Sequence, residues 1–222
     1  MSLAFDLITF DCYGTLIDWE KGISRAFQRE AKRNGRALDA ATIIAAYHAE
    51  EPAVESEAFR PYRDVLNRTA QRVASRLGLP IAPERAGFLA ESLPTWPPFA
   101  DTNAALERLV KRFRLGILSN VDDDLLTATR KHFTVRFDLI VTAEQVGSYK
   151  PSHGHFIEAR WRAGEARWLH AAQSYFHDVL PASALDIPVA WVNRKGEQPD
   201  HGGPLPTIEV SNLTELADRL GV

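Results

Sequence analysis

A short apolar run near the N-terminus ends at a carboxylate, and this feature constrains the fold most. The run Leu7–Phe10 is followed directly by Asp11, and Gly14 comes three residues later. An apolar run of this length that is closed by a turn residue is typical of a buried strand. In an open α/β sheet, ligands bind just outside the carboxyl ends of the strands. Asp11 is therefore predicted to be a nucleophile or a metal ligand, and the alternative is an acidic residue that only caps a turn.

Strand and helix patterns alternate along the second half of the chain. Further strands are predicted at residues 113–118, 137–141, 168–172, 189–192 and 208–210, with helical segments between them. Strands that alternate with helices indicate a parallel, Rossmann-like sheet. The predicted fold class is therefore α/β.

Four consecutive helices are predicted between the first two strands, over residues 19–34, 38–54, 61–77 and 83–92. A segment of this length is too long for a simple crossover between parallel strands. The sequence therefore predicts a core domain made of residues 1–17 and 95–222, and an inserted helical domain of residues 18–94.

Composition excludes several classes of partner. The chain has 222 residues, a net charge of −3 and a single cysteine, Cys12. The weak negative charge gives no reason to expect nucleic acid or an anionic membrane as a partner, and no apolar run approaches the roughly 20 residues that span a bilayer. Because the N-terminus does not resemble an export signal and one cysteine forms no internal disulfide, we expect a cytoplasmic protein. Cys12 is expected to be a small buried residue rather than a thiol nucleophile.

Polar residues recur where predicted strands end or shortly after them. They are Asp11, Ser119, Lys150 and the pair Gln173 and Ser174. The ends of parallel strands lie on one edge of the sheet, so these side chains are predicted to meet in one cleft. Each has an ordinary alternative: Ser119 and Asn120 cap the next helix, Lys150 is a solvated loop cation, and Asp178 caps its helix.

These residues carry a resemblance to a known family. The segment Asp11-Cys12-Tyr13-Gly14-Thr15-Leu16 resembles the first motif of the haloacid dehalogenase (HAD) superfamily, in its type II 2-haloacid dehalogenase-like branch. Ser119-Asn120, Lys150-Pro151 and Asp178 match the second, third and fourth motifs in the family's order. The resemblance implies a HAD core, with the inserted helices forming a cap that excludes water and selects substrates.

The resemblance also implies roles for these residues. Asp11 would attack an electrophilic carbon or phosphorus and form an ester or acyl phosphate that water then opens. Lys150 would keep Asp11 ionised, and Asp178 would position Lys150 or activate the hydrolytic water. The Thr15 hydroxyl would orient the attacking oxygens. The residues expected to bind substrate are Ser119, Asn120, Tyr13 and Ser174.

Two departures from the family pattern separate reaction classes. HAD phosphatases carry a second Asp two residues after the nucleophile, where this chain has Tyr13, and an upstream acid in the fourth motif, where it has Gln173. A magnesium site needs oxygen ligands and balanced charge, and this one is under-supplied. We therefore predict substitution at carbon with no required cofactor and no metal. The alternative is a magnesium-dependent phosphatase with Asp11 and Asp178 as ligands.

Other departures concern the leaving group. The type II enzymes carry a halide-binding Arg in the region that is 41–47 here, an aromatic hydroxyl where this chain has Phe156, and an Asn where it has Tyr175. Arg60 or Arg63 is a candidate substitute for the Arg. A relative in this branch opens the ring of azetidine-2-carboxylate, a reaction without a halide, and the candidates to protonate its leaving nitrogen are Glu50, Glu51 and Glu55.

The sequence thus predicts a HAD-like hydrolase that acts at carbon of a small 2-substituted carboxylic acid, either a 2-haloacid or azetidine-2-carboxylate, through an aspartyl ester on Asp11. A non-catalytic HAD-like binding protein is the second alternative. The expected partner is the small-molecule substrate, and the chain is expected to be a monomer or a homodimer.

Overall fold

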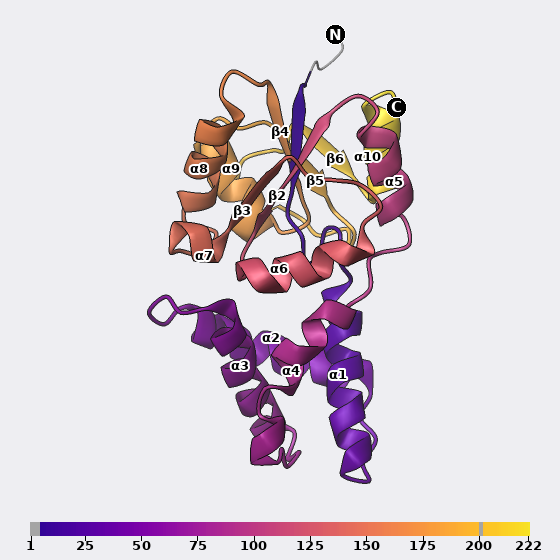
Figure 1. Cartoon of the computed structure of the whole chain (residues 1–222), viewed down its shortest axis with the longest axis vertical. Coiled ribbons are helices and arrows are strands. Elements are labelled where there is room, and N and C mark those ends of the chain that lie inside the picture. The colour runs from indigo at the N-terminus through magenta and orange to yellow at the C-terminus, as the bar shows by residue number, and fades with distance from the viewer. Residues whose placement is uncertain (1–4, 200–201) are drawn as a thin grey trace. The chain divides into compact units, whose positions relative to one another are not determined.

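The computed structural model describes residues 5–199 and 202–222, and the chain forms two compact units (Figure 1). Within the described residues, the first unit contains residues up to Ile17, Pro98–Asn120 and Lys131–Val222. The second contains Asp18–Pro97 together with Val121–Arg130. The limits of the inserted domain at residues 18 and 94 stay a prediction.

The first unit is built on a six-stranded parallel sheet, which confirms the predicted α/β fold class. The strands lie in the order β3-β2-β1-β4-β5-β6, so the N-terminal strand is central. Their bounds are β1 Leu7–Phe10, β2 Arg114–Ser119, β3 Leu139–Thr142, β4 Trp168–Ala172, β5 Val189–Val192 and β6 Ile208–Val210. β1 is buried throughout, as expected of a strand with neighbours on both sides and helices over both faces.

Helices flank this sheet on both sides. Figure 1 shows α7 (Ala143–Val146), α8 (Gly154–Ala163) and α9 (Leu180–Ala184) on one side, and α5 (Thr102–Leu109) and α10 (Leu213–Arg219) on the other. An apolar cluster that includes Leu118, Phe156 and Val189 fills the space beneath α8 and α9. The sheet is thereby held as a rigid platform for the loops at its carboxyl edge.

One predicted helix of this unit has a different form. The helix expected over 178–185 begins earlier, as a π-helical turn at Tyr175–Val179 that continues into α9. Ser174 starts the turn: its hydroxyl accepts from the His177 N–H, and its carbonyl accepts from the Val179 N–H five residues ahead. Such widened turns are frequent at functional sites, and this one carries Asp178.

The second unit is helical, and the regions predicted as helices are helical in outline. Its helices are α1 Trp19–Arg33, α2 Ala40–Glu55, α3 Tyr62–Arg76, α4 Phe88–Ser92 and α6 Asp123–Thr129. The predicted helix 83–92 is divided into a 3-10 turn, Pro83–Arg85, and α4, with Gly87 between them. In residues 5–199 and 202–222, none of the helices combines the length and apolarity needed to cross a membrane.

Segment Val121–Arg130 joins the second unit through a helix cap. α3 begins after Pro61, which offers no capping side chain. The carboxylate of Asp122 supplies the cap from elsewhere in the chain, accepting from the Tyr62 N–H at 2.6 Å and the Arg63 N–H at 2.9 Å. A carboxylate at a helix N-terminus satisfies free N–H groups and complements the helix dipole.

Candidate functional site

The loops that follow the strands bring three charged side chains of the first unit together. The Lys150 ammonium donates to Asp11 Oδ1 at 2.9 Å, to Asp178 Oδ1 at 2.7 Å and to the Leu118 carbonyl at 3.0 Å. An ammonium has three protons to donate, so its donors are filled. Lys150 is only 2% exposed, which excludes the alternative of a solvated loop cation.

Thr15 holds the second oxygen of the candidate nucleophile. Its hydroxyl donates to Asp11 Oδ2 at 2.9 Å and accepts from the Gln173 N–H at the same distance. Both oxygens of Asp11 therefore have a fixed donor, and the carboxylate plane is set by residues from two different loops.

Asn120 fixes the backbone that carries the lysine. Its side-chain oxygen accepts from the Lys150 N–H at 2.7 Å, and its amide donates to the Lys150 carbonyl at 3.0 Å. The neighbouring Ser119 is fully buried, and its hydroxyl oxygen has no partner among the described residues. Ser119 thus keeps a hydroxyl without a partner among the described residues, whereas the amide of Asn120 is engaged by Lys150.

Asp178 has one occupied and one unoccupied oxygen. Oδ1 accepts from Lys150 and from His170 Nε2 at 2.9 Å, whereas Oδ2 is buried without a partner in the described part of the chain. Burial opposes ionisation, but Lys150 and His170 outweigh it and hold the pKa of the Asp178 carboxyl below its usual range. Asp178 is therefore an ionised, buried carboxylate whose Oδ2 has no partner among the described residues, and its side chain does not cap a helix.

Burial also acts on the other two charges. It raises the pKa of the Asp11 carboxyl, as does the charge of Asp178, while Lys150 and Thr15 act against that rise. Burial opposes the charge on Lys150, but the two carboxylates outweigh it and raise the pKa of the ammonium. Desolvation raises the pKa of the Cys12 thiol well above its ordinary value, which leaves this neighbour of Asp11 unsuited to be a thiolate nucleophile.

The other predicted substrate-binding residues lie in the turns around this cluster. Tyr13 is half-buried in the turn after β1. Ser174 uses its hydroxyl to start the π-helical turn and pairs with His177 Nδ1 at 3.1 Å. This contact gives His177 a role in the loop, in agreement with its omission from the predicted catalytic residues.

The positions where type II enzymes bind halide have structural contacts in this chain. Phe156 is fully buried and packs edge-on against His170, with 5.2 Å between ring centroids. The Tyr175 hydroxyl donates to the Pro204 carbonyl at 2.7 Å. In the second unit, Arg60 pairs with Glu57 at 2.8 Å and Arg63 with Asp124 at 2.6 Å, so both candidate substitutes are engaged by carboxylates.

The three candidate acids of α2 differ in their surroundings. Glu50 pairs with Arg76 at 2.7 Å. Glu51 instead accepts from the Tyr47 hydroxyl at 3.2 Å, and burial together with the charge of Glu55 raises the pKa of Glu51 to about 7. Glu51 therefore retains a proton at pH values where an ordinary carboxyl has lost it.

Two buried histidines near the site escaped the sequence analysis. His170 lies in β4 and contacts Asp178, and His155 lies in α8 with Nε2 3.1 Å from the Ser119 carbonyl. Burial lowers the pKa of His155 to about 3, so it is a neutral partner of the Ser119 backbone. The available signal for His170 was a polar residue in the centre of the predicted strand 168–172, where an apolar residue is the rule.

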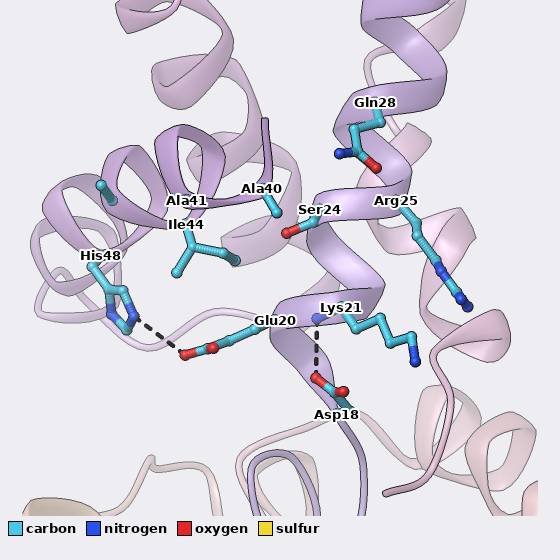
Figure 2. A pocket seen from close by; sticks show the side chains of 11 residues that line it. Asp18, Glu20, Lys21, Ser24, Arg25, Gln28, Ala40, Ala41, Ile44 and His48 are labelled. Atoms are coloured by element: carbon cyan, nitrogen blue, oxygen red, sulfur yellow. Dashed lines mark hydrogen bonds and ion pairs between the residues drawn. The ribbon is translucent and has the colours of Figure 1, made fainter. Parts of the chain in front are cut away.

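The described residues contain no group of three His, Cys, Asp or Glu side chains arranged to hold a metal ion. The second unit has a surface groove of about 700 Å³ between α1 and α2, lined by residues that include Lys21, Arg25 and His48 (Figure 2). Glu20 and His48 approach to 3.7 Å across it. None of the predicted site residues lines this groove, so the polar cluster of the first unit remains the candidate site.

Comparison with known proteins identifies the class. The family model for haloacid dehalogenase-like hydrolases matches residues 5–162, more than half of the chain. The chain therefore belongs to the haloacid dehalogenase-like hydrolase family, and it is an enzyme of the hydrolase type.

Individual relatives sharpen this placement. An (S)-2-haloacid dehalogenase of Pseudomonas putida, H-109, is 28% identical over 220 residues, covering 96% of each chain. An (S)-2-haloacid dehalogenase of Pseudomonas sp. strain YL is 24% identical over 217 residues, 95% of this chain and 92% of the relative. The L-2-haloacid dehalogenase from Xanthobacter autotrophicus, solved with chloropropionic acid covalently bound, shares the fold with a TM-score of 0.84 at 18% identity, covering 97% of this chain and 98% of that one.

Proposed function

We propose that this hydrolase acts at carbon of a small 2-substituted carboxylic acid through an aspartyl ester on Asp11. The observation that carries the proposal is the Lys150 ammonium, which bridges Asp11 and Asp178 in the interior of the first unit. The bridge places a charged nucleophile beside a second carboxylate that has a free oxygen. Substitution followed by hydrolysis requires this pair of functions.

In the first step, an oxygen of Asp11 attacks carbon 2 of the substrate. A carbon–oxygen bond forms while the bond to the leaving group breaks, and the leaving group departs with the electron pair. Lys150 and Thr15 orient the attacking carboxylate. Ser119, whose buried hydroxyl has no partner among the described residues, is our candidate to bind the substrate carboxylate.

In the second step, water opens the ester. Asp178 Oδ2 takes a proton from water as the water oxygen adds to the carboxyl carbon of Asp11. The ester then breaks, the 2-hydroxy acid leaves with the proton from Asp178, the second proton of the water passes to solvent, and Asp11 is restored as a carboxylate with one oxygen that came from water. The lowered pKa of Asp178 keeps this carboxyl ionised, so Oδ2 is available to accept the proton.

The relatives favour a 2-haloacid as the substrate. Both curated relatives are named (S)-2-haloacid dehalogenases, and the Xanthobacter enzyme was solved with a haloacid covalently bound, as a covalent route requires. L-azetidine-2-carboxylate remains the second substrate, because Phe156 and Tyr175 stand where halide-binding groups are expected and both have packing roles.

The residues at the site do not fit a magnesium-dependent phosphatase. Gln173 supplies a neutral side chain where that class has an acid, and Asp178 Oδ1 already accepts from a cation and an imidazole. A divalent cation beside the Lys150 ammonium would add positive charge to a site with only two carboxylates. No step of the proposed reaction is therefore assigned to a metal.

The test is turnover of four compounds by the purified protein: chloroacetate, fluoroacetate, L-azetidine-2-carboxylate and p-nitrophenyl phosphate, each with magnesium or with chelator. We expect a carbon substrate to be turned over equally in both conditions. Asp11→Asn should lose activity by at least about 1000-fold, since the nucleophile is gone. In a single turnover in ¹⁸O-labelled water, the label should appear in Asp11 and not in the released hydroxy acid.

Other outcomes decide against the proposal. Turnover of the phosphate alone, only with magnesium, would establish the phosphatase. Label in the hydroxy acid after one turnover would show direct attack by water. A non-catalytic binding protein would show no turnover of any of the four compounds, and Asp11→Asn would leave every measurable function intact.

A further inference from the structure

A buried polar chain runs behind Asp178 along one face of the sheet. His170 Nε2 lies 2.9 Å from Asp178 Oδ1, and His170 Nδ1 lies 2.8 Å from the Thr9 hydroxyl. The Trp168 indole donates to the same hydroxyl at 2.7 Å. Thr9 and His170 are fully buried, so water does not supply these contacts.

The sheet is shaped to hold these hydrogen-bonded side chains in place. Thr9 pairs directly with His170 across β1 and β4, and with Gly116 across β1 and β2. A Cβ on Gly116 would lie 3.0 Å from the Thr9 methyl and 2.9 Å from the Leu139 carbonyl, so only glycine leaves room for Thr9. Phe156 closes the other side of the imidazole with an edge-on contact. His170 has little freedom to take another orientation.

The hydrogen bonds define the form of the imidazole. The Thr9 hydroxyl accepts from the Trp168 indole and also contacts His170 Nδ1, which holds the ring in place. A carboxylate only accepts, so the proton of the imidazole lies on Nε2 and is donated to Asp178 Oδ1. Second partners of this kind fix the tautomer and the ring orientation of a histidine.

The consequence for Asp178 is an asymmetry between its two oxygens. Oδ1 receives two donors, Lys150 Nζ and His170 Nε2, whereas Oδ2 receives none among the described residues. Donors stabilise the lone pairs they bind and make that oxygen a weaker base. If His170 were absent, Oδ1 would keep only Lys150, and the carboxylate would be free to rotate about its Cβ–Cγ bond.

We propose that His170 is a positioning residue that occupies Oδ1 of Asp178 and so presents Oδ2 as the single base for ester hydrolysis. This inference rests on the proposed function and concerns only its second step. The proton moves from water to Oδ2 as the water oxygen adds to the Asp11 ester, and His170 keeps its own proton throughout. Ester formation does not use Oδ2 and is independent of His170.

The experiment separates the two steps in a rapid-mixing measurement with chloroacetate, or with whichever carbon substrate the wild-type enzyme turns over. Intact mass after quenching measures the fraction of protein in the ester form. His170→Leu should form the ester at close to the wild-type rate but hydrolyse it about 10–100-fold more slowly, the size of loss typical for groups that support a reacting residue. The ester should therefore accumulate.

Two further variants and one control separate positioning from packing. His170→Gln retains an N–H donor within reach of Oδ1 and should restore most of the hydrolysis rate. Thr9→Val keeps the volume but removes the partner of Nδ1, so its hydrolysis rate should fall between those of wild type and His170→Leu. Trp168→Phe perturbs the same buried chain without touching His170 and should leave both steps close to wild type.

Each outcome bears on a different claim. A wild-type enzyme that turns over a carbon substrate without an ester on Asp11 overturns the proposed function and this inference with it. A wild-type ester together with unchanged hydrolysis in His170→Leu overturns the inference alone. Equal slowing of both steps in His170→Leu, His170→Gln and Thr9→Val shows a packing role and also overturns it. If His170→Leu does not fold, Thr9→Val and His170→Gln give the same decision, because Thr9→Val must slow hydrolysis selectively.

Discussion

A cluster of charges in the first unit differs in burial from most ion pairs of the second. The first buries an ammonium and two carboxylates beside a histidine, and the side chains of Lys150 and Asp178 are each only 1% exposed. The second places most of its ion pairs at the surface, such as Arg76 with Glu50 and Arg72 with Glu57. Burial of an ion pair is costly, and replacing such a pair by apolar residues often stabilises a protein. The buried charges of the first unit are therefore not explained by stability, and the exposed ion pairs of the second contribute little to it.

The substitution with the largest expected effect is the one that breaks the buried cluster. Lys150→Met leaves Asp11 and Asp178 without their shared cation, and we expect a loss of about 3–5 kcal/mol in the free energy of unfolding, together with loss of turnover. Arg76→Met, which removes an exposed partner of Glu50, should cost no more than about 1 kcal/mol. Urea denaturation of both variants at neutral pH measures the difference. Equal losses would contradict the distinction between the two units.

The second unit should respond more strongly to packing than to charge. Gly22 in α1 lies under Trp96, and a Cβ there would be 2.2 Å from the indole Cγ. Alanine normally favours a helix by about 1 kcal/mol over glycine, but Gly22→Ala should destabilise the protein by about 1–3 kcal/mol because the core is overpacked. In a Trp96→Leu background the same change should cost less. A Gly22→Ala variant with raised urea midpoint would show that this contact is not tight.

A smaller effect tests how Val121–Arg130 belongs to the second unit. Asp122→Ala removes both acceptors at the start of α3, and a lost helix cap costs about 0.5–2 kcal/mol. Asp39→Ala is the matched control, because Asp39 caps α2 through the Thr42 N–H from within its own segment. Hydrogen exchange should show faster opening of the first turn of α3 in Asp122→Ala and of α2 in Asp39→Ala. Unchanged exchange in α3 would contradict the role of Asp122.

The last effect changes with pH and concerns the raised pKa of Glu51. Its value in the folded protein is about 7, against 4.5 for an ordinary glutamate. The folded chain binds the Glu51 proton more tightly than the unfolded chain does. The protonated Glu51 therefore adds to the free energy of unfolding below pH 4.5, and this addition declines as the pH rises toward 7. The slope is at most about 1.4 kcal/mol per pH unit.

The matched variants are Glu51→Gln and Glu50→Gln, compared by urea denaturation from pH 4.5 to pH 8. The free energy of unfolding of Glu51→Gln should not show this decline with pH, because the glutamine side chain does not ionise. Glu50→Gln should retain it. A wild-type stability that is flat or rising over this range, with no difference between the variants, would contradict the assignment.

The sequence determined the order of the elements and the edge at which the chemistry lies. Alternation of apolar runs with helical patterns predicted the parallel sheet, and polar residues at strand ends predicted that Asp11, Lys150 and the region of Asp178 would meet. Both inferences work because strand direction and side-chain period are local properties of the chain. The structure confirms the sheet and brings these three side chains into contact.

Tertiary structure decided which atoms are used and which are free. The sequence offered Asn120 for substrate, but its amide is bound to the Lys150 backbone. Asp101 stands at the start of α5 without capping it, because its carboxylate pairs with Arg194 at 3.0 Å and accepts from the Leu213 N–H at 2.7 Å. Contacts between residues so far apart in the sequence depend on the register of distant elements, which no local pattern encodes.

The partner of Asp178 is the plainest example. His170 sits in an apolar strand, where its polarity has no local explanation, and Thr9 sits in another. Only the pairing of β1 with β4 sets the two side by side beneath the site. The sequence determined that carboxylates lie at this edge of the sheet, and the pairing of the strands decided which oxygen of Asp178 is left without a partner among the described residues, because hydrogen-bond partners are assigned by position in space.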